Sequence, residues 1–453
     1  MDFEKIINNQ KEFYLTHKTK DVDYRIDQLK KFRKVIEKNQ DKLFEAIQKD
    51  FGKSRFETYV TEISFLLNDL DYYISNTKKL AKPNSVKTNL VNLPGSSKIY
   101  NEPLGTVLVI GAWNYPYQLS LAPAIAAIAA GNTCIIKPSE IAEHSAAAMA
   151  EIINHNFNEQ VLHVVLGGVE ETTALLKIKF DKIFFTGSTN VGRIVYEAAA
   201  KNLTPVTLEL GGKSPAIVTK NTNFETAAKR IVWGKYINAG QTCVAPDYIM
   251  VDASVKEKFL EYLRQYIKEF NYAADSNQYT RIINRKNFER LQKLIVPEKI
   301  YFGGDNIPDK LYLHPTILQD ITWEDDVMKE EVFGPILPVL SYQYYREALA
   351  EIVVRDKPLA AYLFSDDRDE QELFTEQLSF GGGCINDVLM HLGNPHLPFG
   401  GVGKSGIGNY HGKYGFETFS HQKAVMKRAM WGEPDLKYPP YTEKKMKWIK
   451  KLM

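Results

Sequence analysis

The first eighty residues carry apolar side chains at helical spacing. Leu29, Phe32 and Ile36 recur three or four positions apart, and Leu43 and Ile47 continue the pattern among lysines, glutamates and glutamines. A period of this kind is typical of amphipathic helices whose apolar face packs on a core. The sequence therefore predicts helices from residue 2 to about residue 80.

The pattern changes after residue 82. Proline, asparagine, serine and glycine gather between Pro83 and Ser97, which predicts an extended arm or linker. Short apolar runs then alternate with helical stretches. The predicted strands are 106–110, 133–136, 161–165, 183–186 and 206–208, and the predicted helices are 119–130, 140–156, 170–177 and 192–201. This order indicates an α/β fold with a doubly wound parallel sheet, which binds ligands beyond the carboxyl ends of its strands.

The alternation continues beyond Glu209, with strand candidates at 248–251 and 361–364, and predicts a second α/β domain. The run from Leu397 to Gly408 is so rich in glycine that we expect a tightly wound loop there. The tail after Ser420 has no clear period, and we expect it to be less regular.

Length and charge narrow the possible classes of protein. The chain has 453 residues, enough for two or three domains, and its net charge of +2 argues for neither nucleic acid nor an anionic membrane as a partner. Three scattered cysteines, Cys134, Cys243 and Cys384, predict no disulfide framework and no metal site. Without a secretory pattern at its start, the sequence favours a cytoplasmic protein with at most one working thiol.

Cys243 is the candidate nucleophile. It ends the segment Asn238-Ala-Gly-Gln-Thr-Cys, in which Gly240 allows a close backbone turn before the thiol. A cysteine on such a turn can present both its sulfur and its own N–H to a substrate, and the thiolate is the attacking form. The alternative is a buried cysteine that packs as a small apolar side chain.

Glu209 and Asn114 are candidates for the base and for an oxyanion donor. Glu209 stands among apolar strand residues, where desolvation would raise its pKa as a general base for water requires. The alternative is a structural ion pair with Lys213. Asn114 follows a strand and could donate a hydrogen bond to a developing oxyanion, or it could serve only the turn before Pro116.

Three further segments could hold a ligand with phosphate and ribose groups. Gly187, Ser188 and Gly192 lie between a strand and a helix, where backbone N–H groups suit a phosphate, although the spacing is not GxGxxG. An ordinary strand–turn–helix connection is the alternative. Lys137 and Glu140 follow another strand and could hold ribose hydroxyls or simply start a helix.

Glu331 and Phe333 occupy the third segment, Glu-Val-Phe-Gly-Pro, and are ambiguous when taken alone. Phe333 could pack on a flat ring or fill the core.

Taken together, these segments resemble the aldehyde dehydrogenase superfamily over nearly the whole chain. The resemblance rests on Trp113-Asn-Tyr-Pro116, Ile136-Lys-Pro-Ser-Glu140, Phe185-Thr-Gly-Ser188, Leu208-Glu-Leu-Gly-Gly-Lys-Ser-Pro215, Gly240-Gln-Thr-Cys243 and Glu331-Val-Phe-Gly-Pro335. The class 3 branch, with its fatty and aromatic aldehyde dehydrogenases, is suggested by Thr204–Pro215, Gly240–Tyr248, Leu397–Gly403, Tyr410–Lys413 and Phe416–His421.

The resemblance implies a role for each candidate residue. Cys243 would be the nucleophile, Glu209 the base, and Asn114 with the Cys243 N–H the oxyanion site. NAD or NADP would be held by residues of the first half and by one later segment, namely Trp113, Lys137, Glu140, Gly187, Ser188, Gly192, Glu331 and Phe333. The implied reaction is NAD(P)-dependent oxidation of an aldehyde, possible substrates being long-chain or aromatic, through a thiohemiacetal and a thioester on Cys243.

The resemblance also implies a Rossmann-type cofactor domain, a second α/β catalytic domain and a small oligomerisation arm of a homodimer. The expected boundaries are 1–82 and 101–208 with 394–418 for the cofactor domain, 209–393 for the catalytic domain, 83–100 and 419–438 for the arm, and 439–453 for a C-terminal tail.

Alternatives stay open at this point. A relative that transfers the acyl group to coenzyme A would not need Glu209, and a non-catalytic descendant would need none of Asn114, Glu209 and Cys243. The tail from Glu443 to Met453 mixes five lysines with apolar residues and could touch a membrane, but we favour a solvated helix or frayed end.

Overall fold

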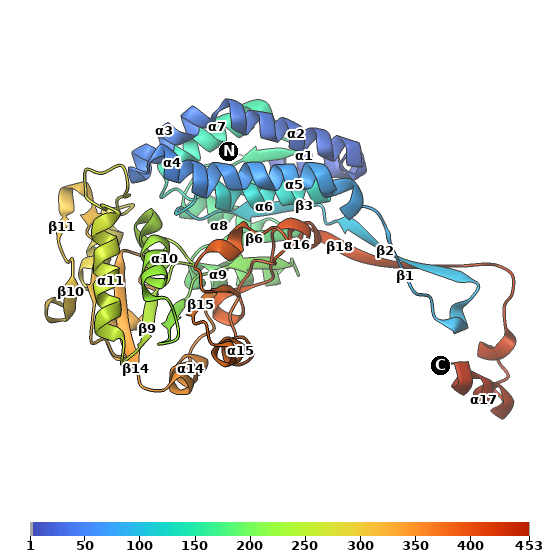
Figure 1. Ribbon diagram of the computed structural model, residues 1–453. Helices are drawn as coiled ribbons and strands as arrows, with labels where there is room; N and C mark the ends of the chain where they lie inside the picture. The colour runs from blue at the N-terminus through green and yellow to red at the C-terminus, as the bar shows by residue number, and fades with distance from the viewer. Residues whose placement is uncertain (1–2, 453) are drawn as a thin grey trace.

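The computed structural model describes residues 3–452, which form two α/β bodies and a projecting arm (Figure 1). A six-stranded sheet has the strand order β17-β7-β6-β3-β4-β5, and a seven-stranded sheet has the order β10-β13-β14-β9-β8-β15-β16. A three-stranded sheet, β1-β2-β18, forms the arm. The predicted α/β fold with two sheets in succession along the chain is confirmed.

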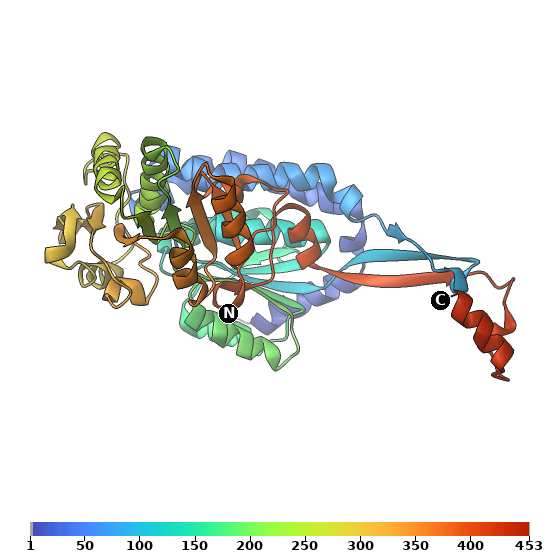
Figure 2. The ribbon, with the colours of Figure 1, turned by 60° about the horizontal axis from the view of Figure 1, so that its bottom comes forward.

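Most of the N-terminal helices pack on one face of the six-stranded sheet (Figure 1), whereas α1 packs on the other face, where Ile6 and Ile7 contact the core beside Leu108 and Ile135 (Figure 2). Their apolar faces, including Leu29, Phe32, Leu43 and Ile47, are fully buried, as the helical spacing predicts. The helices are α1 (Phe3–Leu15), α2 (Val22–Lys38), α3 (Gln40–Phe51), α4 (Arg55–Thr58) and α5 (Ser64–Leu80), with the π-helical turn η2 (Tyr59–Ile63) between the last two.

The six-stranded sheet follows the predicted alternation of strands and helices. Its parallel strands are β3 (Thr106–Ile110), β4 (Thr133–Lys137), β5 (Leu162–Val164), β6 (Lys182–Thr186) and β7 (Val206–Glu209). The connecting helices are α6 (Gln118–Ala130), α7 (Glu143–Asn156), α8 (Val169–Lys177) and α9 (Thr189–Ala200). Register pairs Ile110 with Lys137 and Thr186 with Glu209, so the carboxyl ends of four strands meet at one edge.

The glycine-rich run is not entirely the loop that we expected. Gly406 and Ile407 form β17, which pairs antiparallel with β7 at Glu209 and Leu208. A Cβ at Gly406 would lie 2.3 Å from the Leu208 carbonyl oxygen, so the close approach of the two backbones requires glycine. Glycine-rich composition signals this approach as well as it signals a loop, which is why the loop prediction was wrong here.

The seven-stranded sheet holds the middle of the chain. Its strands are β8 (Pro215–Val218), β9 (Tyr248–Asp252), β10 (Ile300–Phe302), β13 (Thr316–Leu318), β14 (Ile336–Tyr342), β15 (Ala360–Phe364) and β16 (Gly382–Ile385). The helices α10 (Phe224–Tyr236), α11 (Lys256–Glu269), α14 (Tyr345–Val353) and α15 (Arg368–Gln377) pack around it. Strands β9 and β15 confirm the two strand candidates of this region.

The arm joins two segments that lie far apart in the sequence. Strand β2 (Gly95–Pro103) pairs antiparallel with β18 (Ser420–Arg428), from Pro103 opposite Ser420 to Gly95 opposite Arg428, and β1 (Asn84–Val86) pairs with β2. Figure 2 shows this ribbon projecting from the body. The expectation of an irregular tail was wrong as far as residue 428, because the partner that orders β18 lies more than three hundred residues earlier.

The chain ends in α17 (Glu443–Leu452), an exposed helix at the far end of the arm (Figure 1). None of the helices within residues 3–452 is both long and apolar enough to cross a bilayer.

Candidate active site

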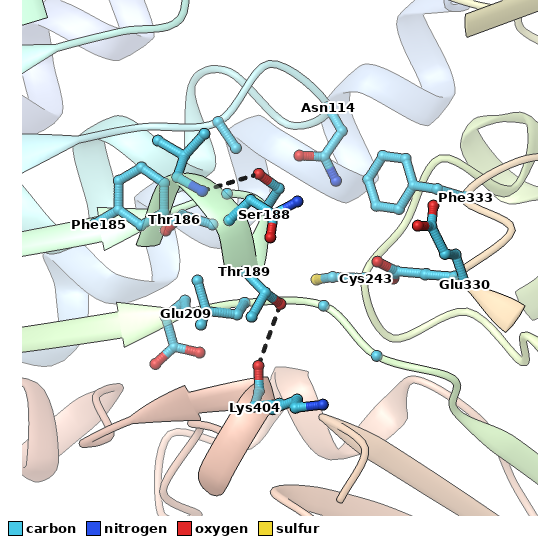
Figure 3. A pocket seen from close by; sticks show the side chains of 18 of the residues that line it. Asn114, Phe185, Thr186, Ser188, Thr189, Glu209, Cys243, Glu330, Phe333 and Lys404 are labelled. Atoms are coloured by element: carbon cyan, nitrogen blue, oxygen red, sulfur yellow. Dashed lines mark hydrogen bonds between the residues drawn. The ribbon is translucent and has the colours of Figure 1, made fainter. Parts of the chain in front are cut away.

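A cavity of about 1140 Å³ lies where the carboxyl ends of the first sheet face the second α/β body (Figure 3). Nearly all of the residues singled out in the sequence line it, namely Trp113, Asn114, Lys137, Glu140, Gly187, Ser188, Glu209, Cys243, Glu331 and Phe333. Gly192 is the exception. A Cβ there would come within 2.7 Å of Leu210, so this glycine lets α9 pack closely on the end of β7.

Cys243 follows the short helical turn η4 (Ile237–Gly240), in which the backbone is left-handed at three successive positions. A Cβ at Gly240 would lie 2.3 Å from the carbonyl oxygen of Gly334, so only glycine fits this turn. Figure 3 shows the sulfur directed into the cavity. This placement rules out the alternative of a cysteine that only fills the core.

The Cys243 thiol has a strongly perturbed pKa. Its pKa is raised to about 12, mainly by burial and also by the negative charges of Glu331 and Glu209, while the backbone N–H groups of Cys243 and Val244 oppose the rise. Without a bound ligand the group is therefore a thiol at neutral pH, and nucleophilic attack requires its proton to leave.

Glu209 ends β7 and is 3% exposed. Within residues 3–452 neither of its carboxylate oxygens has a hydrogen-bond partner, and burial raises its pKa well above the usual range. The alternative of an ion pair with Lys213 is wrong, because the Lys213 ammonium binds the Asp247 carboxylate and the carbonyl of Val327 instead. An unpaired carboxylate in a cavity is costly to keep and marks a candidate base.

Asn114 is 3% exposed and lies just beyond β3. Its Nδ2 donates to the Gln241 carbonyl oxygen at 3.0 Å, two residues before Cys243. Asn238 Nδ2 in turn donates to the Asn114 carbonyl oxygen at 2.9 Å. These contacts span more than 120 positions of sequence, so a purely local turn role does not account for this asparagine.

Groups suited to a dinucleotide line the other end of the cavity. The first turn of α9 faces it, capped by Ser188, whose Oγ accepts from the Val191 N–H at 3.4 Å. Lys137 Nζ lies 3.7 Å from Glu140 Oε2 and donates to the Pro138 carbonyl oxygen at 2.6 Å. A helix N-terminus suits a pyrophosphate, and a lysine with a carboxylate suits ribose hydroxyls.

Glu331 and Phe333 lie across the cavity from α9. The pKa of Glu331 is raised to about 8, mainly by burial and also by the charge of Asp247, while the Gly212 N–H opposes the rise. The Phe333 ring packs edge-on against Trp113, with centroids 5.3 Å apart.

Four residues near Cys243 were not predicted from the sequence. Tyr115 Oη and Thr242 Oγ1 share a hydrogen bond of 2.6 Å, and the Asn238 N–H donates to Glu57 Oε1 at 2.9 Å. The only feature of the sequence that marks Glu57 is its place in the first turn of a helix. Acidic residues are common there, so this position does not predict a hydrogen bond with Asn238.

Comparison with known proteins gives a consistent result. Residues 1–425 match the sequence profile of the aldehyde dehydrogenase family. The 4,4'-diaponeurosporen-aldehyde dehydrogenase of Staphylococcus aureus is 47% identical over 98% of this chain and 97% of its own length. Aldehyde dehydrogenase family 3 member A2 of Rattus norvegicus is 43% identical over 99% of this chain and 93% of its own.

Solved structures agree with the sequences. The substrate-bound state of Staphylococcus aureus AldH superposes with a TM-score of 0.97 at 46% identity, covering 100% of this chain and 99% of that one. A Staphylococcus aureus betaine aldehyde dehydrogenase complexed with NAD+ has a TM-score of 0.84 at 26% identity over 94% and 89% of the two chains. A Methanocaldococcus jannaschii glyceraldehyde-3-phosphate dehydrogenase complexed with NADP gives the same score and identity over 94% of both chains.

The chain belongs to the aldehyde dehydrogenase family, and its relatives of the family 3 type confirm the predicted class 3 resemblance. It is an enzyme that oxidises aldehydes with NAD or NADP, as the resemblance implied.

Proposed function

We propose that the protein oxidises an aldehyde to the free carboxylic acid through an acyl group carried on Cys243. One observation supports this reading above the others. The buried Glu209 carboxylate lines the same cavity as the Cys243 sulfur and has no partner within the described chain. A buried glutamate whose oxygens are not engaged in hydrogen bonds is suited to take a proton from a water molecule that enters the site. Attack by that water converts a thioester to an acid.

The residues of the cavity fit a nicotinamide dinucleotide. Gly187, Ser188 and the first turn of α9 would hold the pyrophosphate, Lys137 and Glu140 one ribose, and Glu331 the other, with Phe333 and Trp113 beside the flat nicotinamide ring. Within residues 3–452, the oxygens of Glu209 and the Thr186 hydroxyl are buried there without hydrogen-bond partners, as expected in a cavity that a polar ligand enters. When bound, the cofactor supplies the hydride acceptor.

The protein's own groups then perform the remaining steps. The Cys243 thiol gives its proton to solvent water, and its sulfur attacks the aldehyde carbon. The oxyanion of the thiohemiacetal is stabilised by the Asn114 amide and the Cys243 N–H. After hydride loss, the sulfur holds a thioester. Glu209 takes a proton from water, the resulting hydroxide attacks the thioester carbon, and the sulfur departs as thiolate with release of the acid.

The Glu209 side chain must rotate before it can activate water at the thioester. In the view of Figure 3 its carboxylate points away from the Cys243 sulfur. Rotation of the side chain would bring it toward the thioester, and because neither oxygen is hydrogen-bonded within the described part of the chain, the rotation breaks no hydrogen bond there.

Trapping the acyl enzyme tests this proposal. With aldehyde and NAD+, Glu209→Gln should accumulate an adduct whose mass equals the acyl group and which maps to the Cys243 peptide, whereas the wild type releases free acid. Cys243→Ala should give no adduct. An adduct absent from Glu209→Gln with cofactor binding intact would contradict the role of Glu209, and an acyl-coenzyme A product would contradict hydrolysis.

The finer assignments belong to the same proposal. We propose a long-chain or aromatic aldehyde as the substrate class; the similar Staphylococcus aureus protein is named for 4,4'-diaponeurosporen-aldehyde. We place the boundary between cofactor and catalytic domains at residues 208 and 209, at the end of β7 and before β8 enters the second sheet. The projecting arm is suited to pair with a second copy in a cytoplasmic homodimer, and α17 is assigned as a solvated helix.

A further inference from the structure

The segment that carries Cys243 contains two non-glycine residues in the left-handed region. Asn238 has φ 53° and Ala239 has φ 51°. Asparagine tolerates this conformation, but alanine does so at a cost of roughly 1–2 kcal/mol. Such a turn persists only where its surroundings hold it in place. Asn238 and Ala239 are both fully buried, so the holding contacts come from the protein.

Asn238 is the centre of those contacts. Its Nδ2 donates to the carbonyl oxygens of Asn114, at 2.9 Å, and of Gln241, at 3.0 Å. Asn114 Nδ2 donates to the same Gln241 carbonyl oxygen at 3.0 Å. The Asn238 amide therefore joins the two backbone segments that supply the proposed oxyanion donors, one carrying Asn114 and one carrying the Cys243 N–H.

The backbone N–H of Asn238 points to a different element. It donates to Glu57 Oε1 at 2.9 Å, across 181 positions of sequence. Glu57 is itself fixed, because its N–H donates to Ser54 Oγ at 3.1 Å and its carbonyl oxygen accepts from Thr61 Oγ1 at 2.7 Å. The half-buried carboxylate is thus held by a capped helix and aimed at the start of the strained turn.

The surroundings act on the Glu57 carboxyl in both directions. Burial raises its pKa above the usual value, and the charge of Lys53 and the Asn238 N–H offset only part of that rise. Lys53 is 1% exposed, and its ammonium lies 4.5 Å from the centroid of the Tyr115 ring, next to Asn114. A carboxyl oxygen accepts a hydrogen bond whether the group is ionised or neutral, so the contact with the Asn238 N–H does not depend on the charge of Glu57.

We infer that Glu57 is a positioning residue for the oxyanion site, acting through Asn238 on Asn114 and on the backbone before Cys243. The inference rests on the proposed role of Asn114 and of the Cys243 N–H. Small displacements of such donors are costly, because they stabilise charge only at the right distance from the oxygen. Glu57 would therefore influence the acylation step without touching substrate or cofactor.

The test compares substitutions at this position by the rate of the first NADH burst. Glu57→Leu should slow the burst at saturating NAD+ by about tenfold, since it removes the acceptor that holds the turn. Glu57→Gln, which keeps an oxygen at the same reach, should recover most of the rate. Glu45→Leu removes an exposed carboxylate from α3 and serves as the matched control. The dissociation constant of NAD+ should be the same in all four proteins.

A double-mutant cycle separates this inference from the function on which it rests. If Glu57 acts through Asn114, Glu57→Leu in an Asn114→Ala background should cost little more than Asn114→Ala alone. If the rate losses of the two single variants multiply in the double variant, the inference is overturned and the proposed function stands. A burst at the wild-type rate in Glu57→Leu would have the same consequence. A wild-type burst in Asn114→Ala would overturn the oxyanion role and the inference together. Should Glu57→Leu fail to fold, Glu57→Asp, which withdraws the carboxylate by one methylene, takes its place in the cycle.

Discussion

Glu62, in the π-helical turn η2, and Glu209, at the end of β7, are two buried glutamates with opposite surroundings. Glu62 Oε2 accepts from the backbone N–H groups of Tyr117 and Gln118, at 2.9 and 2.8 Å, and the Lys53 ammonium lies 3.9 Å from Oε1. Glu209 has no comparable partner within residues 3–452. Burial raises the pKa of both, but only for Glu62 do Lys53 and the two N–H groups oppose the rise, which leaves it at about 7.

The difference shows that the partners of a buried carboxylate indicate whether it serves the fold or the reaction. Glu62 supplies acceptors to the N-terminal end of α6, where the backbone has donors without partners of their own, so its burial serves the fold. Glu209 supplies nothing to the fold and adds a desolvation cost. A carboxylate kept under those conditions is available to a ligand or to water, and its separation from Lys213 preserves that state.

The largest expected effect is on turnover. Glu209→Gln should lower kcat by about 10³-fold, the scale on which a general base contributes, because the thioester then waits for unassisted water. Glu62→Gln should leave kcat near the wild-type value, since it keeps an oxygen acceptor for the end of α6. Steady-state NADH formation at 340 nm measures both. A comparable loss of kcat in the two variants would break the distinction between Glu62, which is hydrogen-bonded through Oε2, and Glu209, whose two oxygens have no partner within residues 3–452.

The sequence alone did not predict most of the contacts compared above. The spacing of apolar residues predicted the strands and so placed Glu209 at a strand end, and the family resemblance singled out Cys243 and Asn114. Nothing local showed that Lys213 would bind Asp247, 34 positions away, or that Glu57 would reach Asn238. Periodicity reports which face of an element is buried, whereas the partner of a buried polar group depends on segments that the fold brings together from afar.

The next largest effect is on stability. Glu62→Leu should lower the free energy of unfolding by about 3 kcal/mol, because two N–H groups lose their acceptor and the buried Lys53 ammonium loses its ion-pair partner. Glu209→Gln should not destabilise the protein. The pKa of Glu209 is raised on folding, so its contribution is full below about pH 4.5 and is lost as the pH rises toward the folded value.

The stability difference between Glu209→Gln and the wild type should consequently grow as the pH increases. Urea unfolding midpoints of the wild type and both variants, measured across the neutral pH range, check the expected loss for Glu62→Leu and the expected gain for Glu209→Gln. A Glu209→Gln protein that is less stable than the wild type at every pH would indicate a structural partner for that carboxylate.

The smallest expected effect is on the rate at which the Cys243 thiol is alkylated. Alkylation of Cys243 by iodoacetamide follows the thiolate fraction, and a thiol pKa of about 12 predicts slow modification at neutral pH that accelerates as the pH rises. Glu331 and Glu209 raise that pKa, whereas Glu62 is not among the groups that act on it. Removing a negative neighbour lowers the thiol pKa, so Glu331→Gln should speed alkylation.

This acceleration should be seen mainly above about pH 8, where Glu331 is ionised, and should stay below about tenfold, the equivalent of one pKa unit. Glu62→Gln should react at the wild-type rate across the same range. Peptide mapping separates Cys243 from the half-buried Cys384, which would otherwise contribute to the labelling. Equal acceleration by Glu331→Gln and Glu62→Gln would show that the Glu62 charge reaches the cavity despite its partners, and that satisfied hydrogen bonds do not isolate a buried carboxylate from the nucleophile.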